Sequence, residues 1–538
     1  MAMHLTDEGL INKKEWEEHG VRLPEYDRAA MRRKTLEAPV WVHFGAGNIF
    51  RGFIAGLQQR LLDAGLADRG IIAAETFDDE IIDRIYKPFD SLTLMVSLRP
   101  DGGTDREVIA SLAEGVKAGP SFPEDWDRLK AYFASPSLQM ASYTITEKGY
   151  SLRDMKGELL GAAKADMENG PAHARHAMAV TAALMLHRYQ NGAAPMALVS
   201  MDNCSHNGEK LRASVMEIAE AWVKNGFADE GFLAWIGDEE KVSFPWSMID
   251  KITPRPAASV QAELEKLGIE DIAPVVTSKN TFIAPFVNAE GPQYLVVEDR
   301  FPNGRPALEK AGVYMTDRDT VNKVERMKVT TCLNPLHTAL AVYGCVLGYD
   351  LIADEMKDRE LNELVHRIGP VEGMPVVTDP GILSPEDFVA EVIDVRIPNP
   401  FMPDTPQRIA TDTSQKVGIR YGETIKSYVA KYGDAKKLEA IPLAIAGWLR
   451  YLIGVDDEGK AFERSSDPML EELSAQLSGI TLGDPDSVGG KVKAILSNAN
   501  IFGSDLYEAG IGERIEELFK EELAGPGAVR ATLKKYLA

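Results

Sequence analysis

Near the start of the chain stands Val40-Trp41-Val42-His43-Phe44, an apolar run that leads directly into Gly45-Ala46-Gly47. Apolar residues then recur at helical spacing from Ile49 to Leu61. A strand, a tight glycine turn and a helix in this order form the first unit of a dinucleotide-binding fold, in which the helix N-terminus faces a pyrophosphate. The segment therefore predicts that a dinucleotide binds at the glycine turn.

The glycine pattern departs from G-x-G-x-x-G at one position. Gly45 and Gly47 take the first two places, but the third is Phe50, and Gly52 follows two residues later. Because the turn lies between a strand and a helix, we expect Gly45, Gly47, Asn48 and Phe50 to contact a dinucleotide. The alternative is a plain tight turn.

Two charged residues border this turn. Arg51 either brings charge to a phosphate or is simply exposed. A second apolar run, residues 70–74, ends at Glu75, whose carboxylate would bind ribose hydroxyls and repel a 2′-phosphate. This favours NAD over NADP as the cofactor, and a solvated acid at a strand end is the alternative.

Strand and helix patterns alternate through the first part of the chain, and helical patterns dominate from about Thr316 onward. We expect an α/β fold: a Rossmann-type domain with a mostly parallel sheet over residues 1–314, then a largely α-helical domain over residues 315–538. The further expected strands are 92–98, 108–112, 138–146, 196–201 and 294–297, with helices at 79–87, 125–133 and 173–189 and a hairpin at 99–103.

Composition limits the possible partners. A chain of 538 residues is too long for one hydrophobic core, which supports two domains. The net charge of −23 argues against binding to nucleic acid or to an anionic membrane, so an anionic substrate needs a local basic cluster. The oligomeric state is left open.

Three features point to the cytoplasm. The three cysteines, Cys204, Cys332 and Cys345, have no spacing typical of a disulfide framework or a zinc site. The N-terminus lacks the apolar core of a secretion signal. The longest apolar stretch, residues 339–348, is well short of the roughly 20 residues that span a bilayer.

The helical segment from Lys328 to His337 contains candidate catalytic side chains. A lysine shielded from water has a lowered pKa and can act as a base, and the amide of Asn334 can donate to a developing oxyanion. Taken alone, each of these residues is more often structural. The segment by itself is an ordinary amphipathic helix.

Motifs elsewhere in the sequence change this interpretation, because together they resemble the mannitol dehydrogenase family of long-chain polyol dehydrogenases. The resemblance runs in order from about residue 40 to about residue 425 and is closest to the fructuronate reductase (D-mannonate oxidoreductase) branch. It implies a Rossmann-type domain, a helical second domain and a mechanism without a metal. The motifs are Gly45-Ala46-Gly47-Asn48-Ile49-Phe50-Arg51-Gly52, Thr144-Ile145-Thr146-Glu147-Lys148-Gly149-Tyr150, Ser200-Met201-Asp202-Asn203 and Ser247-Met248-Ile249-Asp250-Lys251-Ile252-Thr253-Pro254.

The same resemblance assigns catalytic roles. It implies that Lys328 is the general acid and base, that Asn203 and Asn334 polarise the substrate oxygen, and that His337 orients a neighbouring hydroxyl. Glu325 matches a glutamate that relays the proton of the base. Asn203 could instead cap a turn, and Glu325 could form a plain ion pair.

Substrate-binding roles follow in the same way for Asp250, Arg396, Lys416 and Arg420. The three cations could clamp a carboxylate in an otherwise acidic protein. The alternative for the cations is a solvated helix face, and for Asp250 a helix cap or an ion pair.

One extra residue separates the base from the amide. The family spacing is K-x4-N-x2-H, whereas Lys328, Asn334 and His337 give K-x5-N-x2-H. In a regular helix this residue would turn Lys328 to another face, and a π turn would absorb it. The alternative is that Lys328 is displaced.

The sequence therefore predicts an NAD-dependent oxidoreductase that reduces the ketone of an open-chain sugar acid, D-fructuronate to D-mannonate. A mannitol 2-dehydrogenase or another polyol dehydrogenase is the enzymatic alternative. A catalytically silent protein that binds NAD or a sugar acid is the alternative from another class.

Overall fold

The computed structural model describes residues 2–154 and 156–537. The chain forms two compact units, unit 1 from Met1 to Asn322 and unit 2 from Lys323 to Ala538. The division falls inside helix α11 (Arg318–Met327). The predicted domain boundary lies shortly before it, in strand β17 (Tyr314–Thr316).

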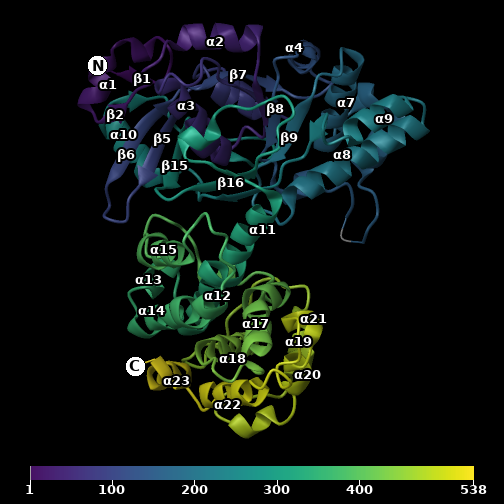
Figure 1. Cartoon of the computed structure of the whole chain (residues 1–538). Coiled ribbons are helices and arrows are strands. Elements are labelled where there is room, and N and C mark those ends of the chain that lie inside the picture. Colours follow the sequence, from purple (N-terminus) through teal and green to yellow (C-terminus); the bar gives the residue numbers. More distant parts are fainter. Residues whose placement is uncertain (1, 155, 538) are drawn as a thin grey trace. The chain divides into compact units, whose positions relative to one another are not determined.

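Unit 1, drawn in purple to teal in Figure 1, is built on a six-stranded parallel sheet with the order β10-β9-β8-β3-β4-β7. Numbered along the sequence, the strands run 3-2-1-4-5-6 across the sheet, which is the order of dinucleotide-binding folds. The order reverses beside β3, so a ligand site is expected at the carboxyl end of that strand. The strands are β3 (Trp41–Phe44), β4 (Ile71–Glu75), β7 (Leu112–Lys117), β8 (Met140–Tyr143), β9 (Met196–Ser200) and β10 (Val242–Ser243).

Both faces of this sheet are covered, because successive side chains of a strand point to opposite sides. Val42 and Phe44 pack into the core formed by α4, α7 and α8. Trp41 packs on the other side, with the π-helical turn η2, the helix α3 and the turn η3. These helices and turns are η2 (Phe50–Ile54), α3 (Ala55–Asp63), η3 (Ile82–Tyr86), α4 (Pro123–Ala134), α7 (Ala177–Gln190) and α8 (Asn207–Lys224).

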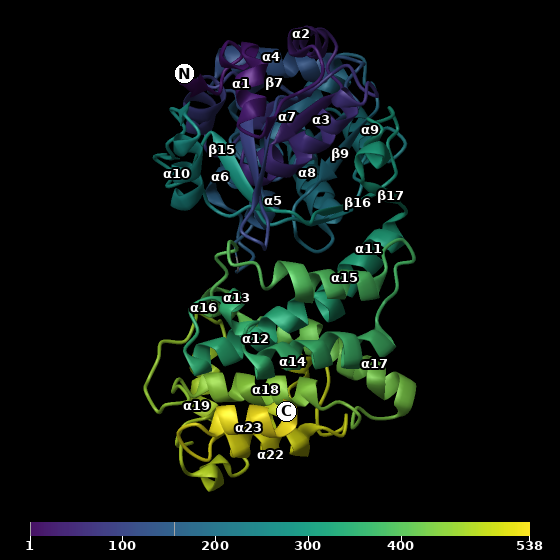
Figure 2. The same cartoon turned by 90° about the vertical axis from the view of Figure 1, so that its left-hand side faces the viewer.

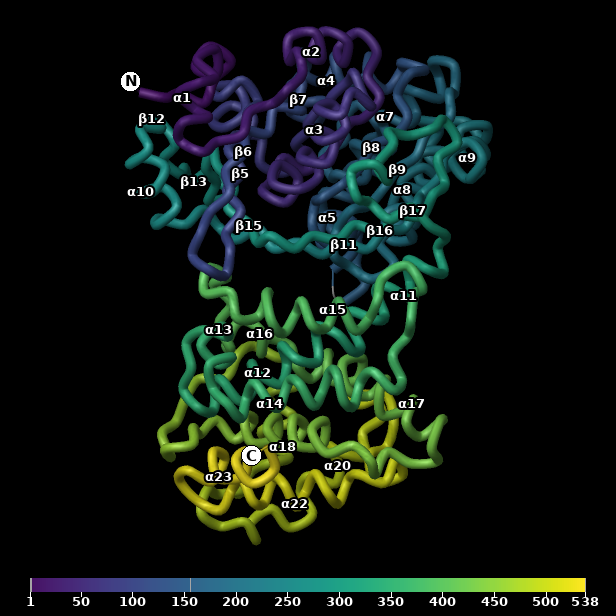
Figure 3. Tube along the Cα trace, turned by 60° about the vertical axis from the view of Figure 1, so that its left-hand side comes forward, coloured from purple at the N-terminus to yellow at the C-terminus, as the bar shows by residue number. Residues whose placement is uncertain are grey.

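Smaller sheets complete unit 1. The predicted hairpin at residues 99–103 is present and joins the antiparallel strands β5 and β6, which lie beside β15 in Figure 3. The remaining strands are β1 (Met3–His4), β2 (Val21–Arg22), β5 (Thr93–Leu98), β6 (Thr104–Ile109), β11 (Ser247–Asp250), β12 (Ile269–Glu270), β13 (Val275–Val276), β14 (Phe282–Ile283), β15 (Phe286–Glu290) and β16 (Tyr294–Glu298). The remaining helices of unit 1 are α1 (Lys13–Glu18), α2 (Arg28–Glu37), α5 (Thr146–Tyr150), α6 (Gly161–Asn169), α9 (Glu230–Gly237) and α10 (Ala258–Lys266).

Unit 2 consists of helices, as predicted. Helix α18 (Ala440–Leu452) is buried along its whole length and lies between α12 (Asn334–Leu347) and α22 (Gly512–Glu522) in Figure 2. A helix that is apolar on all sides belongs in the centre of a bundle. The other helices are α13 (Ile352–Glu355), α14 (Arg359–His366), α15 (Pro385–Glu391), α16 (Pro406–Ile409), α17 (Glu423–Tyr432), α19 (Leu470–Gln476), α20 (Lys493–Leu496), α21 (Ala499–Phe502) and α23 (Ala528–Leu537).

The architecture agrees with the prediction, and the differences are local. The expected strand 108–112 is in fact the end of β6 and the start of β7. Helix α8 was not predicted, although its buried residues Leu211, Val215, Ile218 and Trp222 follow helical spacing. Among the described residues, none of the helices is both long and apolar enough to span a membrane.

Candidate active site

The glycine turn after β3 is tightly packed at Gly45 and open at Gly47. Gly45 has a φ of +101°, and a Cβ there would lie 2.1 Å from the carbonyl oxygen of Thr144. A Cβ on Gly47 would meet nothing within 4 Å, so open space adjoins the backbone at the place where a phosphate approaches. A Cβ on Gly52 would lie 2.7 Å from Val287 Cγ1, so Gly52 takes the close-packing role of the third glycine.

Glu75 is buried, with 6% of its surface exposed, so the solvated acid considered above is wrong. Its carboxylate accepts hydrogen bonds from the backbone N–H groups of Ala46 at 2.7 Å, Phe77 at 2.8 Å and Asp78 at 3.2 Å. Burial raises the pKa of Glu75, and the three donors oppose this. A carboxylate has about four acceptor positions, so about one is left for a ribose hydroxyl.

Arg51 is also buried, so the alternative that it is simply exposed is wrong. Its guanidinium donates to the Ala284 carbonyl and to Asn48 Oδ1, both at 2.9 Å, and burial lowers its pKa to about 10. The Phe50 side chain is fully buried and stacks on His43 at 3.9 Å, which gives it a packing role. Contacts of Asn48, Phe50 and Arg51 with a cofactor remain predictions.

A series of hydrogen bonds runs beneath the turn, and its direction is fixed at both ends. Trp41 Nε1–H can only donate, and it bonds Ser142 Oγ at 2.7 Å. Ser142 then donates to His43 Nδ1 at 2.6 Å, and His43 Nε2–H donates to Thr144 Oγ1 at 2.8 Å. Thr144 ends the series at the carbonyl of Gly45, which can only accept. Burial lowers the pKa of His43, so the ring is neutral and its Nδ1 accepts the hydrogen bond from Ser142.

A second network holds the loop that carries Asn203. Asp202 accepts hydrogen bonds from the backbone N–H groups of Ile145 and Thr146 and from the Tyr150 hydroxyl, at 2.6–3.0 Å. The network thus joins two of the sequence motifs at the ends of β8 and β9 and leaves Asn203 exposed. Asp250 lies buried at the end of β11.

In unit 2 the extra residue after Lys328 is absorbed by a π turn, η6 (Lys328–Cys332), as expected. The Leu333 N–H donates to the carbonyl of Lys328 at 3.1 Å, five residues back. Lys328 is 2% exposed. Glu325 and Asn334 are partly buried on either side of this turn.

The helix that carries Arg420 is bonded to the Lys328–His337 segment at three places. Arg420 donates to Thr338 Oγ1 at 2.5 Å, the residue next to His337. In addition, the Tyr421 hydroxyl donates to the Pro335 carbonyl at 2.9 Å, and the Thr424 hydroxyl donates to the Thr330 carbonyl at 3.2 Å. These bonds fix Arg420 relative to His337.

His337 lies in a group of charged side chains. Its pKa is lowered to about 4, first by burial and then by Arg396, Arg420 and Arg408, while Asp404 opposes the shift. Arg408 forms an ion pair with Asp404. The ring is therefore neutral at pH 7.

Lys416 belongs to the same group of cations. Its pKa is lowered by burial and then by Arg420, while Asp412 and Asp467 oppose the shift, and Arg408 adds a smaller lowering effect. The structure thus brings the three predicted cations Arg396, Lys416 and Arg420 together and adds Arg408, which the sequence prediction missed. The sequence signals only that Asp404 and Arg408, four residues apart, can pair, and it does not place Arg408 near His337.

Four predicted residues share an unusual local backbone. Arg51 lies in η2, Lys328 in η6, Arg396 in η9 (Val392–Arg396) and Arg420 in η11 (Gly418–Gly422), and all four segments are π-helical. π turns are rare and frequently occur at functional sites.

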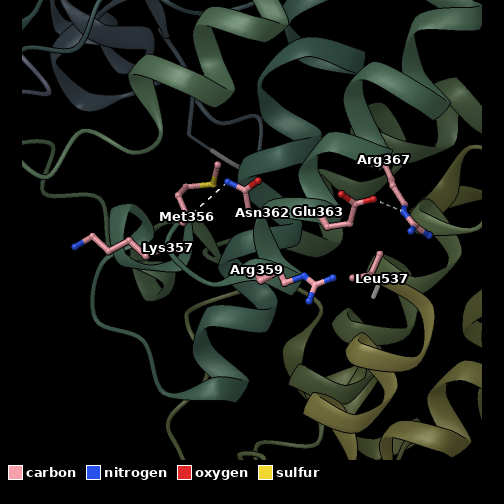
Figure 4. A pocket seen from close by; sticks show the side chains of 7 residues that line it. All are labelled: Met356, Lys357, Arg359, Asn362, Glu363, Arg367 and Leu537. Atoms are coloured by element: carbon pink, nitrogen blue, oxygen red, sulfur yellow. Dashed lines mark hydrogen bonds and ion pairs between the residues drawn. The ribbon is translucent and has the colours of Figure 1, made fainter.

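A surface hollow of unit 2, with a volume of about 420 Å³, lies elsewhere (Figure 4). None of the predicted site residues lines it. It is bordered by Met356, Lys357, Arg359, Asn362, Glu363, Arg367 and Leu537.

Comparison with known families identifies the chain. The mannitol dehydrogenase Rossmann domain matches residues 40–310, and the mannitol dehydrogenase C-terminal domain matches residues 320–521. The chain belongs to the mannitol dehydrogenase family. This confirms the predicted family, fold class and reaction class, that of a dehydrogenase.

Individual relatives agree with this assignment. The chain is 54% identical over 536 residues to a D-mannonate oxidoreductase of Thermotoga maritima, covering 99% of both chains. It is 30% identical to a mannitol 2-dehydrogenase of Pyrenophora tritici-repentis, covering 96% of this chain and 84% of that one. A Pseudomonas fluorescens mannitol 2-dehydrogenase, solved in a ternary complex with NAD and D-mannitol, matches with a TM-score of 0.70 at 25% identity over 99% of both chains.

Proposed function

We propose that this protein reduces the ketone of D-fructuronate, in its open form, to D-mannonate with NADH. The protein is an NAD-dependent dehydrogenase acting on CH–OH groups. The sugar-acid substrate is supported by the 54% identity to a D-mannonate oxidoreductase over the full length of both chains. The turn at Gly45 and Gly47 fits the cofactor, because it leaves open space beside the backbone.

The choice of a sugar acid as the substrate rests on the group of cations in unit 2 that consists of Arg396, Arg408, Lys416 and Arg420. Arg396, Arg408 and Arg420 all act on His337, with Asp404 as their one opposing acid among its named neighbours, although the protein as a whole has a net charge of −23. Such a local excess of guanidinium groups suits a carboxylate, which binds arginine through paired hydrogen bonds. A neutral polyol would offer these guanidinium groups no carboxylate to bind.

In the proposed mechanism, bound NADH supplies a hydride to the ketone carbon. Protonated Lys328 donates a proton to the ketone oxygen, and in the reverse direction the neutral amine removes it. The amides of Asn203 and Asn334 donate hydrogen bonds to this oxygen as negative charge develops. No metal takes part in this scheme.

The remaining residues bind the substrate. Neutral His337 orients a neighbouring hydroxyl, and Asp250 accepts a hydrogen bond from another one. Arg396, Lys416 and Arg420 hold the carboxylate, and Glu325 relays the proton of the base to solvent. The proposal also includes a cytoplasmic location and small molecules as the only ligands.

The deciding experiment compares D-fructuronate, D-tagaturonate and D-fructose as substrates of the full-length protein with NADH and with NADPH. We expect kcat/KM for D-fructuronate with NADH to exceed that for D-fructose by at least about 100-fold, the size expected for a charged group left without its partner. Equal use of fructose would point to a polyol dehydrogenase instead. NADH binding without turnover of any of the three ketoses would point to a silent binding protein.

A further inference from the structure

An exposed aromatic side chain stands at the edge of the sheet where an adenosine is expected. Phe77 follows β4 by two residues and is 69% exposed. β4 is the second strand of the dinucleotide-binding order, and the residues at its carboxyl end border the adenosine half of the cofactor. Single exposed aromatic side chains are common on protein surfaces. The contacts of the loop around Phe77 distinguish this residue from them.

The loop around Phe77 is firmly held on both sides. The Phe77 N–H donates to Glu75, whose carboxylate also binds the Ala46 N–H of the glycine turn. The next residue, Asp78, is buried and accepts a hydrogen bond from the Thr277 hydroxyl at 2.6 Å. The exposed ring is therefore presented by a fixed loop that is bonded directly to the nucleotide turn.

A neighbouring hairpin adds a cation beside the ring. The turn between β13 and β14, in the region labelled β13 in Figure 3, contains Thr277, Ser278 and Lys279. The Ser278 N–H donates to Glu80 at 3.0 Å, which fixes the hairpin against the Phe77 loop a second time. The ammonium group of Lys279 lies 5.4 Å from the centre of the Phe77 ring.

We propose that Phe77 is the platform on which the adenine ring of the dinucleotide stacks, with the β13–β14 hairpin as the adjoining wall. Adenine occupies the ring face opposite Lys279, and the lysine cation enriches the site for an anionic nucleotide. Base stacking on an aromatic side chain is strong enough to contribute substantially to binding. This inference rests on the proposed use of NADH.

The test uses direct binding of three probes to the full-length protein, measured by calorimetry: AMP, NADH and reduced nicotinamide mononucleotide, which lacks the adenosine. We expect Phe77→Ala to weaken the binding of AMP and NADH about tenfold and to leave the mononucleotide unchanged. Phe77→Trp should restore binding, and Lys279→Ala should weaken AMP about two- to threefold.

The matched control is Leu66→Ala, because Leu66 is 54% exposed but precedes β4 and so lies at the other end of that strand. This variant should bind all three probes with the affinities of the unaltered protein. An unchanged AMP affinity in Phe77→Ala, or an equal loss for the mononucleotide, would overturn the adenine platform. Failure of the unaltered protein to bind NADH would instead overturn the proposed function.

Discussion

At the Gly45–Gly52 turn of unit 1, nearby charged side chains are bonded to the backbone, whereas around His337 in unit 2 several cations lower the pKa of one side chain. Glu75 and Arg51 are each buried and form hydrogen bonds mainly with main-chain groups. In unit 2, Arg396, Arg408 and Arg420 act together on one imidazole. Hydrogen bonds to the backbone therefore hold the first region, and electrostatic interactions between side chains dominate the second.

This difference shows how the two regions are expected to respond to mutation. Backbone hydrogen bonds are short-ranged, so a change in the first region should loosen one turn and alter the affinity for the cofactor. Charges act over longer distances, so a change in the second region should alter both substrate binding and the ionisation of its neighbours.

The largest effect is expected for Lys328→Ala. If Lys328 is the general acid and base, kcat should fall about 1,000-fold, because proton transfer by a positioned side chain contributes roughly this much. The Kd for NADH should not change, since that site belongs to the glycine turn. Stopped-flow turnover and NADH calorimetry would measure the two effects.

Lys323→Ala is the matched control, because Lys323 is an exposed lysine one turn earlier in α11. It should keep near-normal turnover. The reverse outcome, with Lys323 essential and Lys328 dispensable, would mean that the π turn does not bring Lys328 to the substrate.

The next effect is expected for Arg420→Met, which removes one cation and keeps an apolar stem. The KM for D-fructuronate should rise roughly 10- to 100-fold, as for a lost charge-assisted hydrogen bond. The pKa of His337, now about 4, should rise because one of the cations that lower it is gone. Histidine NMR titration would follow this shift, and Arg514→Met in α22 should leave both quantities unchanged.

The glycine turn and the helical bundle could be predicted because their signals are local. Val42 and Phe44 precede two glycines, and the pattern alone specifies a strand and a turn. The π turn at Lys328 was one of two alternatives that followed from the family resemblance, because this chain has one residue more than the family spacing K-x4-N. Helix α2 was not expected, because only Met31 and Thr35 are buried on it and no apolar stripe marks it.

The side-chain partners within each region could not be predicted in this way. The sequence places Glu75 at a strand end but does not show that its carboxylate turns inward to the Ala46 N–H. Likewise, Arg408 joins the cations near His337 only because helix α16, which carries it, packs against α12. Such contacts depend on tertiary packing, which periodicity does not record.

A smaller effect is expected for Glu75→Gln. The amide keeps one acceptor oxygen but turns an NH₂ group toward backbone donors, so at least one N–H of the turn loses its partner. We expect the Kd for NADH to rise about three- to tenfold, the size of one net hydrogen bond, with kcat nearly unchanged. Asp68→Asn, an exposed acid before β4, should bind NADH normally, and equal binding by both variants would show that the turn does not depend on Glu75.

The smallest effect on catalysis is expected for a substitution of Glu522, which is hydrogen-bonded to Tyr343 in the C-terminal half of α12. The Tyr343 hydroxyl lies 2.7 Å from the Leu443 carbonyl and 2.6 Å from Glu522 Oε1. A carbonyl can only accept and the hydroxyl has one proton, so if that proton goes to Leu443, Glu522 must be protonated and donate to Tyr343. In agreement, burial raises the pKa of Glu522 to about 8.

Glu522 should therefore make the stability of unit 2 depend on pH. Its pKa is raised from 4.5 in the unfolded state to about 8 in the folded one, so its stabilising effect is complete below pH 4.5 and is lost as the pH rises to about 8. The ideal slope is about 1.4 kcal/mol per pH unit within this window. Glu522→Gln keeps a donor for Tyr343 without the titration, so its Tm should fall less between pH 5 and pH 8.5, with unchanged turnover at pH 7. The neighbouring residue Glu521 is paired with Lys535 and has a lowered pKa, so the control variant Glu521→Gln should keep the original dependence of Tm on pH. The same dependence in both variants would show that Glu522 is ionised in the folded protein.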